Sequence, residues 1–288
     1  MSRPTLKVQI QEIESAAEDF PEHLDLLNLR KAILKILTTL DESPTKGAVS
    51  NISDKNLKQL KENAVASKKP ISSFIDPSIF NRDIVWSTVR EIAEYLVRHH
   101  PQGESLQRLL EALEGKLFDA GEAVRAILYE DAEWFKCLGD SYGVEPSMLL
   151  FLFEAPLQPF FEDLARRVEE ELKEIWWDPF CPVCGRASLV ARIRQRKRYM
   201  ICPFCGAEYL VDLFLCVNCG NNEPYSLGFL TFEGHPEYEL NYCEKCNHYI
   251  KVIHEDRLKR KIPRGLEDLI TRDLDMLAEG PKLSLKRA

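Results

Sequence analysis

The 288-residue sequence lacks long hydrophobic runs: its longest uninterrupted apolar segment, Met148–Phe153, has only six residues. A helix that crosses a bilayer needs about 20 apolar residues, so no membrane span is expected. Residues 1–17 carry charges at helical spacing and lack both an apolar signal-peptide core and a twin arginine. We therefore expect no export signal and a cytoplasmic location.

Positive charge is also scarce. The chain has 38 Lys and Arg residues against 46 Asp and Glu residues, a net charge of −8. Such a chain binds nucleic acid and anionic lipid poorly, so neither is an expected partner. The sequence has no glycine-rich phosphate loop and no catalytic-triad signature. We therefore expect no enzyme activity, no catalytic residue and no residue that binds an organic cofactor.

Cysteine is almost absent from the first part of the chain, where Cys137 stands alone. The other eight of the nine cysteines fall between Cys181 and Cys246, as four pairs with two residues inside each pair. In a reducing cytosol this pattern favours metal or redox chemistry over disulfides. The chain therefore divides near Asp178 into a cysteine-poor part and a cysteine-rich part.

The first part has the apolar periodicity of α-helices. Stripes at 3.6-residue spacing predict helices over 24–40, 77–100, 106–115, 121–138 and 160–174, and a further helix from Pro146 that Pro156 and Pro159 break or kink. The polar stretch 41–69 predicts a loop with one short helix. These stripes are enough to bury a core.

Four residue groups in this part have structural explanations. We expect His99-His100 to interact with the last carbonyls of a helix, and Cys137 to be a buried free thiol. The acidic residues of 160–174 predict a solvated helix face, with a docking surface for a basic partner as the alternative. Trp176-Trp177 predicts an apolar seam between the two parts, with an exposed anchor for a partner as the alternative.

Each cysteine pair lies in a short turn suited to hold a metal ion. The four turns are Cys181–Gly185, Cys202–Gly206, Cys216–Gly220 and Cys243–Asn247. Two thiolates three positions apart can bind one ion, and the glycine after the second lets backbone N–H groups face the sulfurs. Asn247 replaces this glycine in the fourth turn. Asparagine tolerates the left-handed region, so this turn should also form.

The spacing predicts that the turns pair sequentially. Seventeen residues separate Cys184 from Cys202, and 23 separate Cys219 from Cys243, whereas only ten separate the second turn from the third. The predicted sites are Cys181, Cys184, Cys202 and Cys205 (site 1) and Cys216, Cys219, Cys243 and Cys246 (site 2). Since the cysteines complete both sets, His235, His248 and His254 are not expected as ligands.

Strand-like segments between the turns predict two tandem metal ribbons: 189–191, 199–201, 209–215, 227–232 and 249–253. Four sulfurs suit zinc or a single iron ion. The two Cys-Pro-x-Cys-Gly turns of site 1 are rubredoxin-like, which favours iron there. A structural ion can supply about 10–16 kcal/mol to folding, so both ions could be purely structural.

A basic run without acidic residues lies in the first ribbon: Arg186, Arg192, Arg194, Arg196, Lys197 and Arg198. Three explanations stay open. The cations could offset thiolate charge or pair within the fold, dock on a protein, or contact nucleic acid.

Several of these segments resemble the formate dehydrogenase accessory protein family, FdhE. They are the run from Trp176 through Gly185, Arg198-Tyr199, the two later turns, and the tail segments Leu266–Leu269 and Leu274–Ala278. The resemblance is specific over about 171–279. It implies a cytoplasmic assembly factor that associates with the molybdenum- or tungsten-containing catalytic subunit of formate dehydrogenase. It also implies two rubredoxin-like ribbons associated with iron, one ion in each four-cysteine set.

We therefore expect an α+β chain: an α-helical domain at 1–175, metal ribbons at 176–212 and 213–258, and a C-terminal helical tail at 259–288. Our hypothesis is a metal-binding accessory protein that docks on the catalytic subunit during maturation, with the basic run and Trp176-Trp177 in the contact. The alternatives are a nucleic-acid-binding zinc-ribbon protein and a rubredoxin-like electron-transfer protein.

Overall fold

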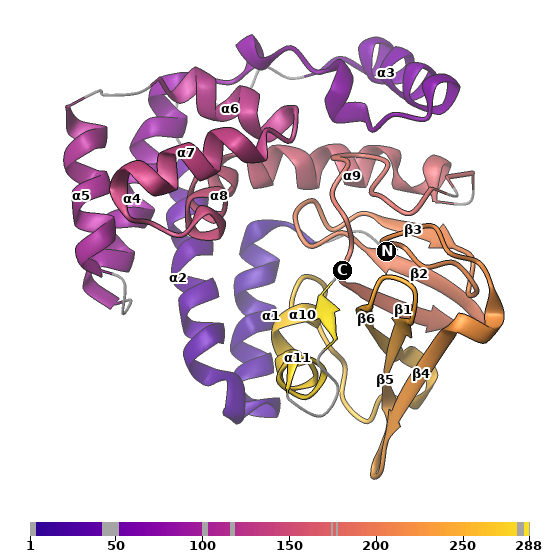
Figure 1. Ribbon diagram of the computed structural model, residues 1–288. Helices are drawn as coiled ribbons and strands as arrows, with labels where there is room; N and C mark the ends of the chain where they lie inside the picture. The colour runs from indigo at the N-terminus through magenta and orange to yellow at the C-terminus, as the bar shows by residue number, and fades with distance from the viewer. Residues whose placement is uncertain are drawn as a thin grey trace.

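The computed structural model describes residues 4–41, 52–99, 103–115, 119–173, 175–176, 178–280 and 285–287. Helices make up the first part, and a β-sheet with two further helices makes up the second (Figure 1). The expected α+β class is confirmed. Within the described ranges, no helix combines the length and the apolar character that crossing a membrane requires.

The helical part follows most of the predicted apolar stripes. Its α-helices are α1 (Leu6–Asp19), α2 (Leu24–Asp41), α3 (Asp54–Ser67), α4 (Arg82–His99), α5 (Gly103–Glu114), α6 (Ala120–Leu128), α7 (Ala132–Tyr142), α8 (Pro146–Glu154) and α9 (Gln158–Leu172). The α3 helix is longer than the short helix that the polar stretch predicted. Residues 42–51 of that stretch lie outside the described residues.

Two predicted helices are each divided in the structure, so these predictions were wrong. The segment 77–100 forms a short 3₁₀ turn and then α4, because the Asn81 side chain accepts hydrogen bonds from the N–H groups of Asp83 and Ile84 and starts a new helix. The segment 121–138 divides between α6 and α7. Glu130 there has a φ of +55°, and the Asp131 side chain caps α7.

The cysteine-rich part forms one continuous sheet. Its strands are β1 (Val190–Arg194), β2 (Lys197–Ile201), β3 (Glu208–Val211), β4 (Leu227–Phe232), β5 (His235–Cys243), β6 (His248–His254) and β7 (Lys286–Arg287), in the order β3-β2-β1-β6-β5-β4, with β7 beside β6. Strand β1 pairs in parallel with β6, from Val190 opposite Lys251 to Ile193 opposite His254. This pairing joins the two predicted ribbons, which the sequence did not reveal.

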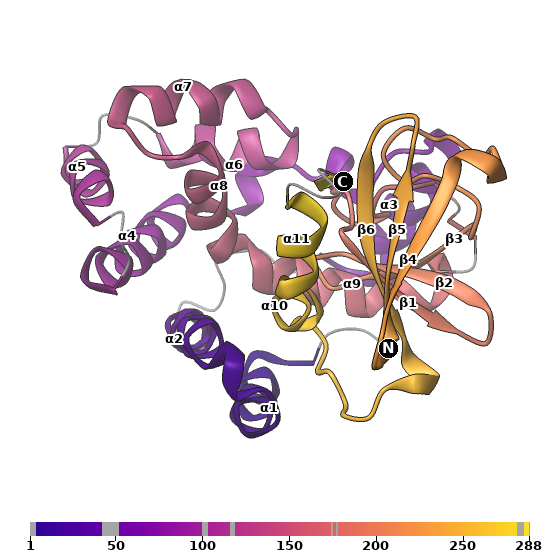
Figure 2. The same ribbon diagram turned by 60° about the horizontal axis from the view of Figure 1, so that its bottom comes forward.

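The C-terminal helices α10 (Glu267–Ile270) and α11 (Arg272–Glu279) lie between the sheet and the α1–α2 pair (Figure 2). Lys251 of β6, which is fully buried, holds these helices to the sheet. Lys251 Nζ lies 2.7 Å from Asp268 Oδ1 and 2.7 Å from Asp275 Oδ2. A buried ammonium group needs such partners, so the tail is held to the sheet by charge as well as by apolar packing.

The helical part packs directly on the first cysteine turn. The N–H groups of Ile71 and Ser72 donate to the carbonyls of Pro182 and Val183, at 2.9 Å each. The ring of Phe161 on α9 lies 5.1 Å from that of Phe204 in the second turn. The larger of two apolar clusters therefore runs from the helices into the sheet and surrounds the first two cysteine turns.

Candidate metal centres

The four cysteine turns share one backbone geometry. In the first three, the glycine after the second cysteine has a positive φ of 71° to 84°. Its N–H donates to the carbonyl of the first cysteine, at 2.9 to 3.0 Å. A residue with a side chain is strained in this conformation, which explains the three glycines.

The fourth turn forms with Asn247 in place of glycine, as predicted. Asn247 has a φ of +58°, and its N–H donates to the carbonyl of Cys243 at 2.8 Å. The departure from the Cys-Gly ending therefore leaves the turn intact.

The turns bring the cysteine sulfurs together in the two predicted sets of four. Within each set, all sulfurs lie within 4.8 Å of one another. Cys181 and Cys184 lie 3.4 Å from Cys205 and Cys202, respectively. In the second set, the sulfurs of Cys216 and Cys246 are 3.6 Å apart, and those of Cys219 and Cys243 are 3.8 Å apart.

These separations fit a metal tetrahedron. Four sulfurs at about 2.3 Å from a central ion lie about 3.8 Å from one another, whereas a disulfide needs about 2.05 Å. The eight cysteines form no disulfide. Each set can therefore hold one metal ion, and no histidine belongs to either group among the described residues.

Site 1 is sealed from solvent. Its four cysteines are at most 1% exposed. Burial raises the pKa values of the Cys181 and Cys205 thiols well above the usual range. Four buried thiolates repel one another, so the ionised set requires a cation at its centre.

An arginine and two glutamates border site 1. The Arg186 guanidinium lies 4.0 Å from the centre of the Phe204 ring and pairs with Glu154 of α8. Burial raises the pKa values of Glu154 and Glu130, although Arg186 opposes the rise, and the nearby Cys184 thiolate adds to it. Arg186 therefore lies between negative groups on both sides, which keeps it charged.

Site 2 is partly open. Cys216 and Cys243 are buried, whereas Cys219 is exposed and Cys246 is half-buried. The Asn221 side chain donates to the Cys243 sulfur at 3.5 Å and to the Ser226 hydroxyl at 2.7 Å. Burial opposes the Cys243 thiolate, but the Cys246 N–H and the Asn221 amide donate to it and lower its pKa to about 7. Burial raises the pKa of Cys216 to about 12.

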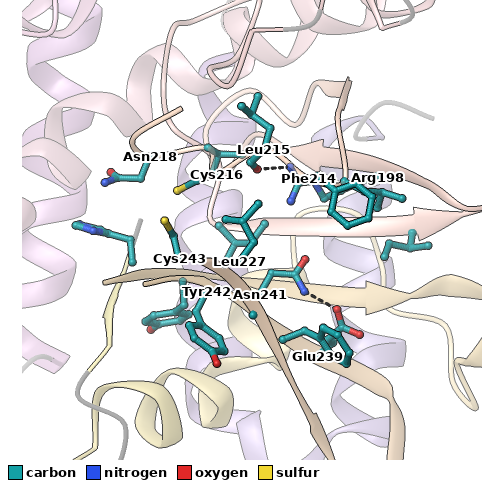
Figure 3. Close-up of a pocket in the computed structure, with 18 residues that line it drawn as sticks. Arg198, Phe214, Leu215, Cys216, Asn218, Leu227, Glu239, Asn241, Tyr242 and Cys243 are labelled. Atoms are coloured by element: carbon teal, nitrogen blue, oxygen red, sulfur yellow. Dashed lines mark hydrogen bonds between the residues drawn. The ribbon is translucent and has the colours of Figure 1, made fainter. Parts of the chain in front are cut away.

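A largely apolar cavity of about 230 Å³ adjoins site 2. Figure 3 shows the sulfurs of Cys216 and Cys243 facing each other at one end, with Arg198 and Phe214 at the other. Phe214 and Phe229, which also line it, are 59% and 67% exposed. Site 2 thus faces both solvent and an apolar surface.

The basic run is mostly paired within the fold. Arg192 lies 2.9 Å from carboxylate oxygens of Glu255 and Glu267. Arg194 pairs with Glu208, and Arg198 donates to the backbone carbonyls of Asp212 and Leu215.

The remaining two cations of the run, Arg196 and Lys197, lie at the exposed tip of the β1–β2 hairpin. Internal pairing therefore accounts for Arg186, Arg192, Arg194 and Arg198.

The predicted structural residues have mixed outcomes. His99 ends α4, and its Nδ1 lies 2.7 Å from the Tyr95 carbonyl, as expected; His100 lies outside the described residues. Cys137 is exposed, so its predicted burial was wrong: it falls on the outer face of α7, whereas Phe135 faces the core. Trp176 is only 3% exposed, which supports the seam; Trp177 is outside the described residues.

The acidic helix α9 is not simply solvated. Glu162 and Glu169 are buried, and Glu162 accepts hydrogen bonds from Gln9 and Gln158. Residue 174 lies outside the described residues. The acidic residues therefore divide between a solvated face and a core-facing polar contact.

Sequence reasoning missed the residues that surround the sulfurs. Glu130 and Glu154 lie far upstream of Arg186 in the sequence, and no local pattern connects them. Asn221 directly follows the glycine of the third turn, where a side-chain amide can reach a sulfur. The position of Asn221 in the sequence could therefore have predicted its contact with a sulfur.

Two comparisons with known proteins agree on one family. A protein of Aquifex aeolicus (strain VF5), described as Protein FdhE homolog, is 34% identical over 142 residues, which cover 48% of this chain and 50% of that protein. The crystal structure of the FdhE protein from Pseudomonas aeruginosa matches 98% of this chain and 97% of its own, with a TM-score of 0.60 and 22% identity. The resemblance to FdhE is confirmed.

The two comparisons carry different weight. The similarity to the Aquifex aeolicus FdhE homolog spans half the length of that relative, whereas the match to the Pseudomonas aeruginosa FdhE structure establishes the fold over nearly the whole chain. No known family model matches the chain.

Proposed function

We propose that this chain is an accessory protein for formate dehydrogenase, which docks on the catalytic subunit in the cytoplasm during maturation and has no enzymatic activity of its own. One observation carries the proposal: two four-sulfur sets lie on one sheet that the helical part braces, in a chain that resembles FdhE. Rigid turns braced in this way suit recognition of a folded surface. A reducing compartment also suits eight free thiols.

The metal ligands are part of this proposal. Site 1 uses Cys181, Cys184, Cys202 and Cys205, and site 2 uses Cys216, Cys219, Cys243 and Cys246. The resemblance favours iron, and zinc fits the same donor set. A bound ion supplies the positive charge and the cross-link that four thiolates need. The domain division at 175, 212 and 258 belongs to the same proposal.

Fewer residues belong to the proposed contact with the partner than the sequence indicated. Trp176 is buried, and its indole N–H donates to the Phe180 carbonyl, so this side chain supports the fold instead of a contact. Of the basic run, we retain Arg196 and Lys197, because both are exposed at the hairpin tip.

Affinity purification of the metal-loaded chain from its native host tests the function. We expect the catalytic subunit of a formate dehydrogenase to co-purify. Reversal of charge at Arg196 and Lys197 should reduce its recovery, whereas Glu244→Gln, an exposed change in the fourth turn, should not. Failure of the unmodified chain to recover the subunit contradicts the proposal. Equal recovery with the charge-reversed variant contradicts only the role of Arg196 and Lys197 in the contact.

The exposure of Cys219 favours one second candidate, rubredoxin-like electron transfer. Reversible bleaching of visible absorption on reduction of the iron-loaded chain would support it. A colourless chain purified from the native host with two tightly bound zinc ions would contradict it.

A further inference from the structure

A second cavity, of about 470 Å³, lies where three distant parts of the chain meet. Its walls come from the turn between α1 and α2, the tip of the β4–β5 hairpin, and the segment from Leu258 to Leu277. No cysteine lines it. Its volume is typical of pockets for small ligands, which often form at such junctions.

One oxygen atom of a buried carboxylate in this cavity lacks a hydrogen-bond partner. Glu237 is 7% exposed, and its Oε2 accepts no hydrogen bond from the described residues. The imidazole Nδ1 of His235 is 3.6 Å from Oε1, longer than a hydrogen bond. Buried carboxylates are normally paired, because burial without a partner costs free energy. A cation bound beside Glu237 would remove this cost.

The other charged side chains at the cavity do not supply the cation that Glu237 requires. Lys259 and Arg260 are exposed, and Arg260 donates to the Asp19 carbonyl. Exposed cations stay hydrated and need no partner. Glu22 and Asp273 are exposed acids of the same lining, and they add negative charge at its rim.

Most of the remaining lining is apolar or aromatic, with His23 and Thr271 as its polar members. Phe20, Phe232 and Tyr238 contribute rings, and Leu258 and Leu274 contribute aliphatic side chains. Ring faces attract cations, and aliphatic walls exclude water from an alkyl chain. The lining therefore suits a ligand with a cationic end and an apolar arm.

We propose that this cavity binds a primary ammonium group on an apolar arm, with the ammonium group paired to Glu237 and the arm against the aromatic rings. Two sources carry this chemistry: a free alkylamine, or the lysine side chain of a partner polypeptide. The proposal does not depend on the function proposed above.

Titration calorimetry of the metal-loaded chain with n-pentylammonium tests the pairing, with n-pentanol as the uncharged probe. We expect n-pentylammonium to bind and n-pentanol to bind at least about tenfold more weakly, as loss of one charge-assisted hydrogen bond implies. Glu237→Gln should weaken n-pentylammonium binding by about tenfold or more. Glu22→Gln removes an exposed carboxylate of the same cavity and should change binding by about twofold or less.

A second arm uses a blocked Gly-Lys-Gly peptide against its Gly-Gln-Gly counterpart. Tighter binding of the lysine peptide than of n-pentylammonium supports a polypeptide source, and the reverse supports a free amine. If Glu237→Gln fails to fold, Phe232→Leu serves as the test of the proposal. Loss of the ring should weaken binding of n-pentylammonium but not binding of n-pentanol. Absence of binding by both cationic probes, equal binding of n-pentanol, or unchanged affinity in the deciding variant overturns the proposal.

Discussion

The two four-sulfur sites have the same set of side chains but different surroundings. All four cysteines of site 1 are buried, whereas site 2 has Cys219 exposed and Cys246 half-buried. Their turns share one hydrogen-bond pattern, so the turns do not cause the difference. Residues 70–72, α8 and α9 cover site 1, while site 2 opens to solvent and to an apolar cavity.

The comparison separates two kinds of information in the sequence. Ligand identity is encoded locally, in segments of five residues. Burial of site 1 is encoded elsewhere, by segments of the helical part that end nine residues or more before Cys181. Since the common core passes around site 1, we infer that site 1 holds the two parts of the molecule together and that site 2 stabilises mainly its own turns.

The largest contrast is expected from removing one ligand at each site. Cys202→Ser should abolish ion binding at site 1 and unfold both parts of the chain, because a structural ion supplies about 10 kcal/mol or more. Cys219→Ser should remove one ion and leave the helical part folded. Circular dichroism and elemental analysis measure both outcomes. Equal loss of helix in the two variants would show that the sites are equivalent.

A smaller contrast is expected at the turn glycines. Gly185→Ala places a Cβ 2.5 Å from Glu130 Oε1 and 3.0 Å from Pro70 Cγ, whereas Gly220→Ala meets nothing within 4 Å. Both changes force alanine into the left-handed region, which costs about 1 kcal/mol. Crowding should add about 1 kcal/mol at Gly185 alone, because the Pro70 ring must shift while the Glu130 carboxylate can rotate away. Denaturant unfolding gives both values, and a matched loss at the two positions would contradict the difference in packing.

Site 2 should release its metal ion to a chelator at least about tenfold faster than site 1, because opening of the sealed site 1 requires local unfolding. The Cys219→Ser variant, which retains site 1, identifies the slow phase. A single phase in the unmodified chain, or a fast phase that survives in this variant, would argue against the assignment.

The smallest effect is expected at the tip of the basic run. Arg196→Ala should change the free energy of unfolding by about 0.5 kcal/mol or less, because Arg196 is exposed. Arg192→Met removes the nearest cation of the buried Glu267, which keeps Arg264 at 3.7 Å and the Gly265 N–H, and should cost about 3 kcal/mol. Thermal and denaturant unfolding compare the two. A large loss for Arg196→Ala would mean that the tip has a structural role.

The sequence predicted the two sulfur sets and the Asn247 turn because turn chemistry is local. It did not predict β5, whose residues His235–Cys243 include proline, glutamate and asparagine, all unfavourable in strands. Pairing with β4 and β6 overrides that preference. The parallel contact between β1 and β6 joins segments more than 50 residues apart, and no local pattern encodes it.

The helical part shows the same limit. The apolar stripes located the helices, but the side-chain caps at Asn81 and Asp131 divided two of them. Whether Cys137 is exposed depends on which face of α7 packs on α8. A shift of one residue in the apolar pattern is enough to change that face.

X-ray absorption at the metal edge, with elemental analysis of the same sample from the native host, tests the central claim most directly. We expect two ions per chain, each bound by four sulfur atoms at about 2.3 Å. A single ion per chain, nitrogen or oxygen among the ligands, or disulfide-bonded cysteines would contradict it.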